Sequence, residues 1–455
     1  MVVELAVTRL GEESVRERLA ELPAARRREI AEAGRELVLR EQLGDPAIPF
    51  SFHTLPLVLD AERVERALAS CSAVIQGLVR LEQRALEQEG ELRARLLGSL
   101  DPPGRRLFEM CNFESPYSLE HRFRRVDAML VPGGCGVLEV NQAAPAFLHF
   151  HDALQRIAGE MLGMLGFEHP PALLAPRVVT WLAGEYRHRL GTESAPEVIA
   201  VVSEAGYPFK QLELPAFTAA CERAARDLGL GTRFHLCYPH ELRLVGERIW
   251  LGDVPIDMIW RNSALLDSYA GREHEIEDYL RMSARHEEHL IVNSTRVWLT
   301  LTKDALSLLG SEAVLDRLGF ATEERRRLLE AVPRTASLAF EPDLADEIMA
   351  AREDWISKPA AGSFSRGFEA GHWHSDASWR QLVRERSGPD FVFQRFVRAP
   401  AGELLELDDD GELHRRAMRF DFCPHHVDGA FPGTALVRAR VEGVTGGRII
   451  PLVVA

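Results

Sequence analysis

The feature that most constrains the fold of this chain is a pair of short apolar runs, at 125–131 and 136–141, with Pro-Gly-Gly at 132–134 between them. Glycines between two apolar runs are typical of a β-hairpin. Both runs are of strand length, and each carries polar side chains among its apolar ones. The sequence therefore predicts a hairpin of two short strands, which can bring side chains from both strands to one place.

Three oxygen-bearing side chains lie on this hairpin. Asp127 is near the start of the first strand, and Glu139 and Asn141 close the second strand two residues apart, on the same face. Two carboxylates and an amide are hard oxygen ligands that suit a magnesium ion holding phosphate oxygens. The alternative is that all three are solvated residues at strand ends, where acidic side chains are common.

The composition limits the functions to consider. A chain of 455 residues is too long for one core and predicts two or three domains. Apolar residues make up 46% and charged residues 27%, as in folded soluble proteins. A net charge of −15 argues against nucleic acid as the main partner, although a local basic pocket can still hold a small anion.

The sequence also favours a cytoplasmic location. Charges near the N-terminus, from Glu4 to Glu13, are unlike the apolar core of a signal peptide. The sequence has no run of 18 apolar residues, so we expect no membrane span. The six cysteines are scattered without metal-type spacing, so we expect reduced thiols.

Residues 1–110 are predicted to be mostly helical. The pattern predicts helix over 12–40 with a break at Pro23, and a second helix from an N-cap at Asp60 that can extend to Leu97. The segment 102–104, Pro-Pro-Gly, is expected to end this region.

Strand, helix and strand patterns over 197–262 predict a small α/β domain with a parallel sheet. Arg261 follows the last apolar run directly, where open α/β sheets place ligand contacts; a purely structural role is the alternative. Short apolar runs at the C-terminal end, 404–407, 416–423, 435–441 and 449–454, predict a final antiparallel layer. The acidic turn at 408–411 resembles a calcium loop only superficially, because no glutamate closes it.

Two lysines are candidate phosphate ligands. Lys303 lies in a predicted helix, and Lys358 ends a predicted strand just before a loop of small residues at 360–367. A strand-end lysine beside a glycine loop can reach nucleotide phosphates, which the loop N–H groups would also bind. The spacing is not that of a P-loop, and an ordinary exposed lysine is the alternative.

Together these residues resemble the ATP-grasp ligases. Arg125, Asp127, Glu139 and Asn141 resemble the R-x-D…E-x-N magnesium motif of that family. Lys303 resembles the first nucleotide-binding lysine of the family. Lys358, with Gly362 and Gly367, resembles the second lysine and the flexible glycine loop that follows it. The segment from Gln394 to Val397 resembles the hinge strand that lies against adenine. The acidic trio precedes the lysines, an order similar to the circularly permuted ATP-grasp enzymes, which include glutathionylspermidine synthetase. The resemblance covers roughly residues 110–455.

The resemblance implies an α/β (α+β) fold, a circularly permuted ATP-grasp with a helical N-terminal region and an inserted small α/β substrate domain. We expect a helical region at 1–110, part of the ATP-grasp core with the acidic hairpin at 111–190, the substrate domain at 191–290, and nucleotide-binding subdomains at 291–455.

The implied reaction is ATP-dependent ligation of a carboxylate to an amine through an acyl phosphate, with ATP and Mg²⁺. Mg²⁺ on Asp127, Glu139 and Asn141 would neutralise phosphate charge, and the two lysines would hold the α- and β-phosphates. Arg125 would steady the transferring group or the tetrahedral intermediate. Arginines are also candidates for carboxylate binding: Arg261, Arg419, Arg438 (also a catalytic candidate) and Arg366 in the loop.

Some residues depart from the family pattern. The glycine loop is short and carries Phe364, and Gln394 stands where many relatives have an acidic residue nearby. No room remains for an amidase domain, so a polyamine substrate is not implied. The rivals are a phosphotransferase on the same scaffold and a non-catalytic nucleotide-binding protein. Expected partners are small carboxylates and amines, with no nucleic acid or membrane; a homodimer is one open alternative.

Overall fold

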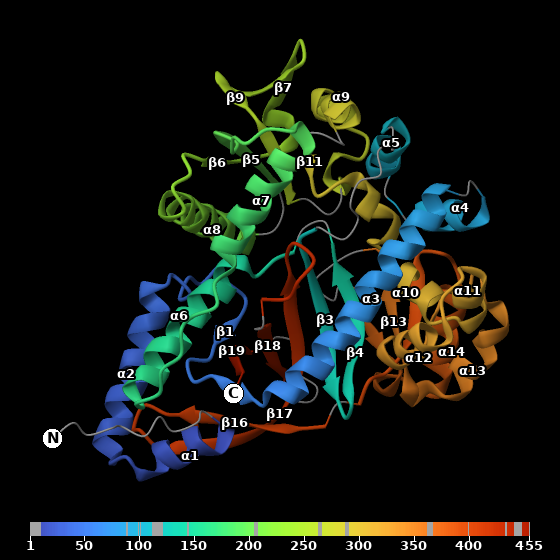
Figure 1. The fold of residues 1–455 in the computed structure, drawn as a ribbon. Helices are drawn as coiled ribbons and strands as arrows, with labels where there is room; N and C mark the ends of the chain where they lie inside the picture. Colours follow the sequence, from blue (N-terminus) through green and yellow to red (C-terminus); the bar gives the residue numbers. More distant parts are fainter. Residues whose placement is uncertain are drawn as a thin grey trace.

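A computed structural model describes residues 11–87, 90–98, 100, 102–111, 122–142, 145–203, 208–262, 266–286, 291–361, 367–398, 400–432, 435–440 and 448–454. The structure is mixed α/β with several separate sheets (Figure 1). Over these ranges, no helix is both long enough and apolar enough to cross a membrane.

The N-terminal region is helical, as predicted. Helices α1 (Glu12–Glu21) and α2 (Ala24–Arg40) are separated at Pro23. Helix α3 (Ala61–Glu87) follows Asp60, whose Oδ1 accepts a hydrogen bond from the backbone N–H of Arg63 at 2.9 Å. A separate helix, α4 (Glu91–Gly98), comes next.

The prediction that Pro102-Pro103-Gly104 ends the helical region is wrong. Helix α5 (Pro102–Met110) begins there. The first turn of a helix has N–H groups without helical partners, so prolines are well tolerated at this position.

The central sheet has the strand order β1-β19-β18-β17-β3-β4, with β2 paired to β19 and β16 to β17. The predicted hairpin is confirmed, and the predicted C-terminal layer continues it directly, because β17 pairs antiparallel with β3. The strands are β1 (Ser51–Phe52), β2 (Leu57–Leu59), β3 (Arg124–Val131), β4 (Gly134–Asn141), β16 (Gly402–Leu407), β17 (Leu413–His426), β18 (Ala435–Arg440) and β19 (Arg448–Val454).

Helix α3 crosses one face of this sheet, over β3 and β4 (Figure 1). Val126, Ala128, Val137 and Val140 of the hairpin are buried in the same core cluster as the apolar side chains of α3. Helices α2 and α6 (Leu148–Met164) share a second cluster with β18 and β19. The apolar side of the hairpin is thus fixed against α3, which leaves the opposite side to its polar residues.

A second, four-stranded sheet is parallel throughout, with the order β11-β10-β5-β6. This confirms the parallel sheet predicted from the strand–helix–strand pattern. Its strands are β5 (Val198–Ser203), β6 (Arg233–Cys237), β10 (Met258–Asn262) and β11 (Ile291–Val292). Helices α7 (Leu174–Leu190) and α8 (Pro208–Asp227) pack on it. The meander β7 (Leu242–Val245), β8 (Arg248–Leu251) and β9 (Val254–Ile256) and helix α9 (Glu277–His286) lie nearby.

A third sheet is antiparallel, with the order β12-β15-β13-β14. Its strands are β12 (Thr335–Ala336), β13 (Trp355–Pro359), β14 (Glu369–Ala370) and β15 (Phe391–Arg395). Strand β15 ends at Arg395, two residues before the predicted end at Val397. The helices of this region are α10 (Asp304–Leu309), α11 (Glu312–Arg317), α12 (Thr322–Ala331), α13 (Ala345–Ala350) and α14 (Asp376–Glu385).

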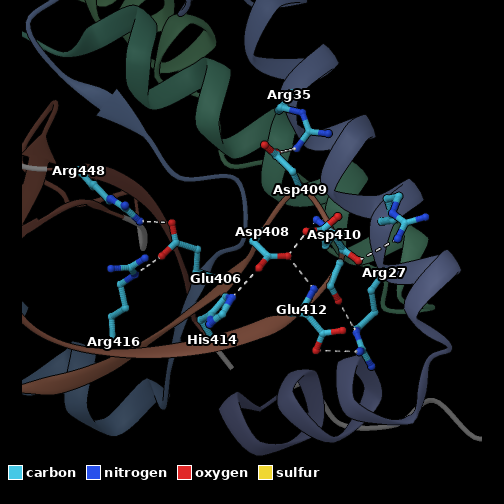
Figure 2. Close-up of polar contacts among 12 residues, drawn as sticks. Arg27, Arg35, Glu406, Asp408, Asp409, Asp410, Glu412, His414, Arg416 and Arg448 are labelled. Carbon is cyan, nitrogen blue, oxygen red and sulfur yellow. Dashed lines mark hydrogen bonds and ion pairs between the residues drawn. The ribbon is translucent and has the colours of Figure 1, made fainter.

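The acidic turn between β16 and β17 links the sheet to the N-terminal helices (Figure 2). The carboxylate of Asp408 accepts hydrogen bonds from the backbone N–H groups of Asp410 and Glu412 and pairs with His414. Asp409 pairs with Arg35 of α2. These carboxylates serve local turn geometry and ion pairs.

Candidate functional site

The polar residues of the hairpin lie on the side away from α3. Asp127 pairs directly with Glu139, and Arg125 with Asn141, so all four share one face. A bulge at Leu138 breaks the simple alternation, since Asp127 pairs with Glu139 but Ala128 pairs with Val137. The extra residue lets the apolar face continue while Glu139 remains on the polar face. Bulges of this kind are frequent next to active sites.

Asp127 lies between two arginines. Arg125 donates to both carboxylate oxygens, from Nε to Oδ1 at 2.7 Å and from Nη2 to Oδ2 at 3.1 Å. Arg438 of β18 donates to Oδ2 at 3.0 Å and also pairs with Asp421 of β17 at 3.3 Å. Asp127 and Arg125 are 2% and 5% exposed. The carboxylate therefore holds two guanidinium groups in fixed positions.

Arg125 retains hydrogen-bonding capacity. A guanidinium has five N–H groups. Two of those of Arg125 bind Asp127, and a third, on Nη1, binds the carbonyl of Ala146 at 3.0 Å. Burial disfavours the charge, but the Asp127 carboxylate outweighs it, so the pKa of Arg125 lies above its ordinary value. Two N–H groups of a permanent cation thus remain for an anionic ligand.

Glu139 contacts the first of the two predicted lysines. The Nζ of Lys303 lies 3.2 Å from Oε2 of Glu139. Burial tends to raise the pKa of Glu139, but the positive charges of Lys303 and then Lys358 outweigh it, and the pKa lies below its ordinary value. The amide Nδ2 of Asn141 is buried and has no hydrogen-bond partner among the described residues. Glu139 is therefore ionised at neutral pH, and it shares the polar face of the hairpin with the amide of Asn141.

Lys358 lies in the same electrostatic environment. The pKa of Lys358 is lowered to about 8, chiefly by burial and further by the positive charge of Lys303, while the Glu139 carboxylate opposes this shift. The backbone N–H of Lys303 also donates to the carbonyl of Ala360 at 2.9 Å, which joins the start of α10 to the end of β13. The two lysines are thus held side by side by the backbone, facing Glu139.

The ammonium of Lys358 is oriented by neighbouring strands. It donates to Oε1 of Gln394 at 2.7 Å, and Nε2 of Gln394 donates to Oγ1 of Thr335 at 2.9 Å. Lys358, Gln394 and Thr335 come from β13, β15 and β12 and are all buried. This chain of hydrogen bonds fixes the direction of the lysine side chain.

The amino-acid usage supplies an independent signal. Of the 54 lysine and arginine residues, only three are lysines: Lys210, Lys303 and Lys358. Almost every other cationic position is arginine, yet two of the three lysines face Glu139. An ammonium on a flexible stem can lose its proton and adapt to a phosphate in ways that a guanidinium cannot.

The glycine loop is described only at its end. Gly362 and Arg366 lie outside the described residues. Gly367 has a φ of +70°, and a Cβ there would lie 2.9 Å from Cγ of Pro359, so only glycine suits this position. Val397 packs against the hairpin, because a Cβ on Gly136 would meet its Cγ2 at 3.2 Å. The segment after β15 therefore touches β4.

The other two predicted arginines, Arg261 and Arg419, lie on other strands, β10 and β17. Arg261 is fully buried at the end of β10 and donates to Oη of Tyr279 at 2.9 Å and to the carbonyl of Asn293 at 3.1 Å. Its neighbour Asn262 is also fully buried, and neither its Oδ1 nor its Nδ2 has a hydrogen-bond partner in the part of the chain that the structure describes. Arg419 is partly exposed on β17, opposite Arg440.

Sequence reasoning missed Asp421 and Thr335. Asp421 pairs with Arg438 through a long-range strand contact that no local pattern shows. Asn262 directly follows Arg261 at the carboxyl end of a parallel strand, the position that the sequence already indicated for ligand contacts.

No protein-family profile and no curated protein sequence matches the chain. Among solved structures, the chain is similar to a glutathione synthetase-like effector from Globodera pallida, in its apo form. The identity is 10%, the match covers 98% of this chain and 100% of that chain, and the TM-score is 0.61.

This chain shares its overall fold with that effector. That result supports the ATP-grasp-like fold expected from the sequence, and it shows the fold alone.

Two further matches are partial. D-cycloserine synthetase DcsG matches at 12% identity, over 56% of this chain and 90% of that chain, with a TM-score of 0.28. D-alanyl-alanine synthetase A from Vibrio cholerae O1 biovar eltor matches at 8% identity, over 56% and 87%, with a TM-score of 0.26. TM-scores this low carry no argument about fold or activity.

Proposed function

We propose that this protein is an ATP-dependent carboxylate–amine ligase that forms an amide through an acyl phosphate and releases ADP. The observation that carries the proposal is the 3.2 Å contact between Lys303 and Glu139. It joins the acidic hairpin to the lysine segments, which are far apart in the sequence and belong to one motif in the ATP-grasp ligases that the chain resembles. We also propose that the chain is a circularly permuted ATP-grasp enzyme, related to glutathionylspermidine synthetase.

The donor set fits a magnesium ion bound mainly through a nucleotide. Glu139 offers a carboxylate and Asn141 an amide oxygen, while Nδ2 of Asn141, which has no hydrogen-bond partner among the described residues, would donate to a phosphate oxygen. Mg²⁺ typically takes one or two protein carboxylates and completes its shell with phosphate oxygens and water. Within the described parts of the chain, no three His, Cys, Asp or Glu side chains form a metal-binding group. When bound at Glu139 and Asn141, the ion would neutralise charge on the phosphates.

Asp127 has a supporting role in this scheme. Its oxygens already accept hydrogen bonds from Arg125 and Arg438, so these arginines compete with a metal ion for the carboxylate. It holds both guanidinium groups beside the reacting phosphoryl group. There they would stabilise negative charge in the transition state and in the tetrahedral intermediate.

The lysines bind the phosphates in this proposal. Lys303 and Lys358 would hold the α- and β-phosphates, with Gln394 fixing the direction of Lys358. A phosphate close to Lys358 would raise the pKa of its ammonium from about 8 and keep it charged. The loop 360–367 would cover the phosphates, and the segment from Gln394 to Val397 would lie against adenine.

The acid substrate would be amino-acid-like. Arg261 and the unsatisfied amide of Asn262 lie at the carboxyl edge of the parallel sheet, where open α/β sheets bind ligands. Arg419 is a second candidate for gripping a carboxylate. The carboxylate oxygen attacks the γ-phosphorus of ATP, ADP leaves, and the amine then displaces phosphate from the acyl carbon.

One observation favours a second candidate, a nucleotide-binding protein without catalysis. Both oxygens of Asp127 are engaged by arginines. If neither arginine releases Asp127, fewer ligands remain for the ion that the reaction needs.

The test is a screen for ADP release with ATP and magnesium over pairs of amino acids and small acids, with product analysis by mass spectrometry. A ligase gives an amide, ADP and phosphate, whereas a phosphotransferase gives a stable phosphorylated acid. Glu139→Gln should abolish turnover, and Glu62→Gln on the exposed surface of α3 should not. ATP binding without ADP release for any pair would favour the second candidate, and full turnover in Glu139→Gln would overturn the site.

A further inference from the structure

Phe147 has an unusual backbone conformation directly beside the site. Its φ of 71° and ψ of 29° are in the left-handed region, which side chains with a Cβ rarely adopt. Among the described residues, the other non-glycine residues with positive φ are Gln42 and Asp428, which are polar. Phe147 is aromatic and only 3% exposed. A bulky residue held this way indicates a local requirement.

The requirement is not the capping of α6. Phe147 precedes the helix, but its side chain makes no capping hydrogen bond. The backbone N–H of Leu148 instead donates a hydrogen bond to the carboxylate of Glu213, on α8. The conformation of Phe147 therefore needs another explanation.

Arg125 supplies that explanation. The ring centre of Phe147 lies 4.5 Å from Cζ of Arg125, within the range of a cation–π contact. The carbonyl of the preceding Ala146 accepts from Nη1 of Arg125 at 3.0 Å and from His425 at 3.1 Å. The turn at Phe147 thus directs both a carbonyl and an aromatic face at one guanidinium.

We propose that Phe147 is a positioning residue for Arg125. The Asp127 carboxylate grips one edge of the guanidinium, the Ala146 carbonyl fixes a second direction, and the ring covers its face. Rotation of the guanidinium plane is then blocked, and its two remaining N–H groups keep one direction toward an anionic ligand. The catalytic part of this inference rests on the proposed function of Arg125.

The kinetic test is a double-mutant cycle. Phe147→Leu should lower kcat about tenfold with little change in the KM for ATP, and Phe147→Tyr, which keeps the ring, should restore most of it. In an Arg125→Lys background, Phe147→Leu should change kcat less than about twofold, because the group it positions is gone. Equal losses in both backgrounds would show a merely structural role.

Phe150 provides a matched control. It is buried and stacks on Phe147 with ring centres 5.9 Å apart. Phe150→Leu removes similar packing beside the same ring without deleting the ring over Arg125. We expect a lower melting temperature for Phe150→Leu, with kcat within about twofold of wild type. A tenfold loss of kcat in that variant would assign the effect to packing.

A measurement without turnover separates this inference from the proposed function. The Arg125 Nε–H resonance in ¹⁵N NMR is identified by its loss in Arg125→Lys. Its hydrogen-exchange rate should rise about tenfold or more in Phe147→Leu and remain near wild type in Phe147→Tyr. An unchanged rate in Phe147→Leu would overturn the positioning role. An accelerated rate in a protein that never releases ADP would keep that role and refute only the ligase.

Discussion

Replacement of Lys358 by methionine should make the protein more stable and inactive. The side chain is 8% exposed, and its pKa is lowered from 10.5 to about 8, chiefly by burial. At ~1.4 kcal/mol per pH unit, this difference corresponds to about 3 kcal/mol of destabilisation by the buried charge. Loss of the hydrogen bond to Gln394 offsets about 1–2 kcal/mol of the gain. The net expectation for Lys358→Met is stabilisation by about 1–2 kcal/mol near neutral pH.

The pH dependence gives this prediction its sign. Below pH 8, Lys358 is protonated in both the folded and the unfolded chain, so its penalty is constant. Between about 8 and 10.5 the folded chain loses the proton first, the unfolded chain binds more protons, and the wild-type free energy of unfolding rises with pH. The advantage of Lys358→Met should therefore be present at about pH 7 and disappear by about pH 10.5.

Urea-unfolding midpoints of the wild type, Lys358→Met and Lys358→Arg across this pH range measure the effect. Lys358→Arg keeps a charge that cannot be lost, so its difference from Lys358→Met should not shrink with pH. A Lys358→Met variant less stable than wild type at about pH 7, or with a pH-independent difference, would refute the reasoning.

Other expected outcomes follow from the same contacts. Asp127→Asn leaves the buried Arg125 and Arg438 without their shared anion and should cost about 3–5 kcal/mol in chemical denaturation; a loss under about 1 kcal/mol would contradict the bridge. Glu139→Gln removes the carboxylate that pairs with Lys303 and should cost about 1–3 kcal/mol while abolishing turnover, so an active enzyme with this substitution would count against the site. Gly367→Ala should destabilise the chain by about 1–2 kcal/mol, because its φ is +70°; an unchanged unfolding midpoint would exclude that strain.

Local patterns in the sequence predicted much of the fold. The hairpin was predictable because both its strands and its turn are contiguous, and the parallel sheet because strands and helices alternate over 197–262. The pairing of β17 with β3 was not predictable, because it joins segments about 300 residues apart and no local pattern encodes the register. The bulge at Leu138 was missed for a similar reason: alternation fixes the face of each residue only while it is unbroken.

The candidate site shows the same division. Residue type and spacing led to Glu139, Asn141 and the two lysines. The ion-pair partners of Asp127 were not predictable: it is bound by Arg125, two residues before it on β3, and also by Arg438 of β18. An aspartate can serve either as a metal ligand or as an ion-pair partner, so the residue type does not distinguish the two roles. Only the geometry does.

The central claim is that one site formed by the acidic hairpin and two distant lysines binds a nucleoside triphosphate. Its most direct test is NMR of protein labelled with ¹³C at the lysine ε-carbon, which gives three signals because the chain has only three lysines. A non-hydrolysable ATP analogue with magnesium should shift the signals of Lys303 and Lys358 and leave that of Lys210 in place, with at least about tenfold weaker binding in Glu139→Gln. Saturable binding that shifts neither Lys303 nor Lys358, or no binding at millimolar analogue, would contradict it.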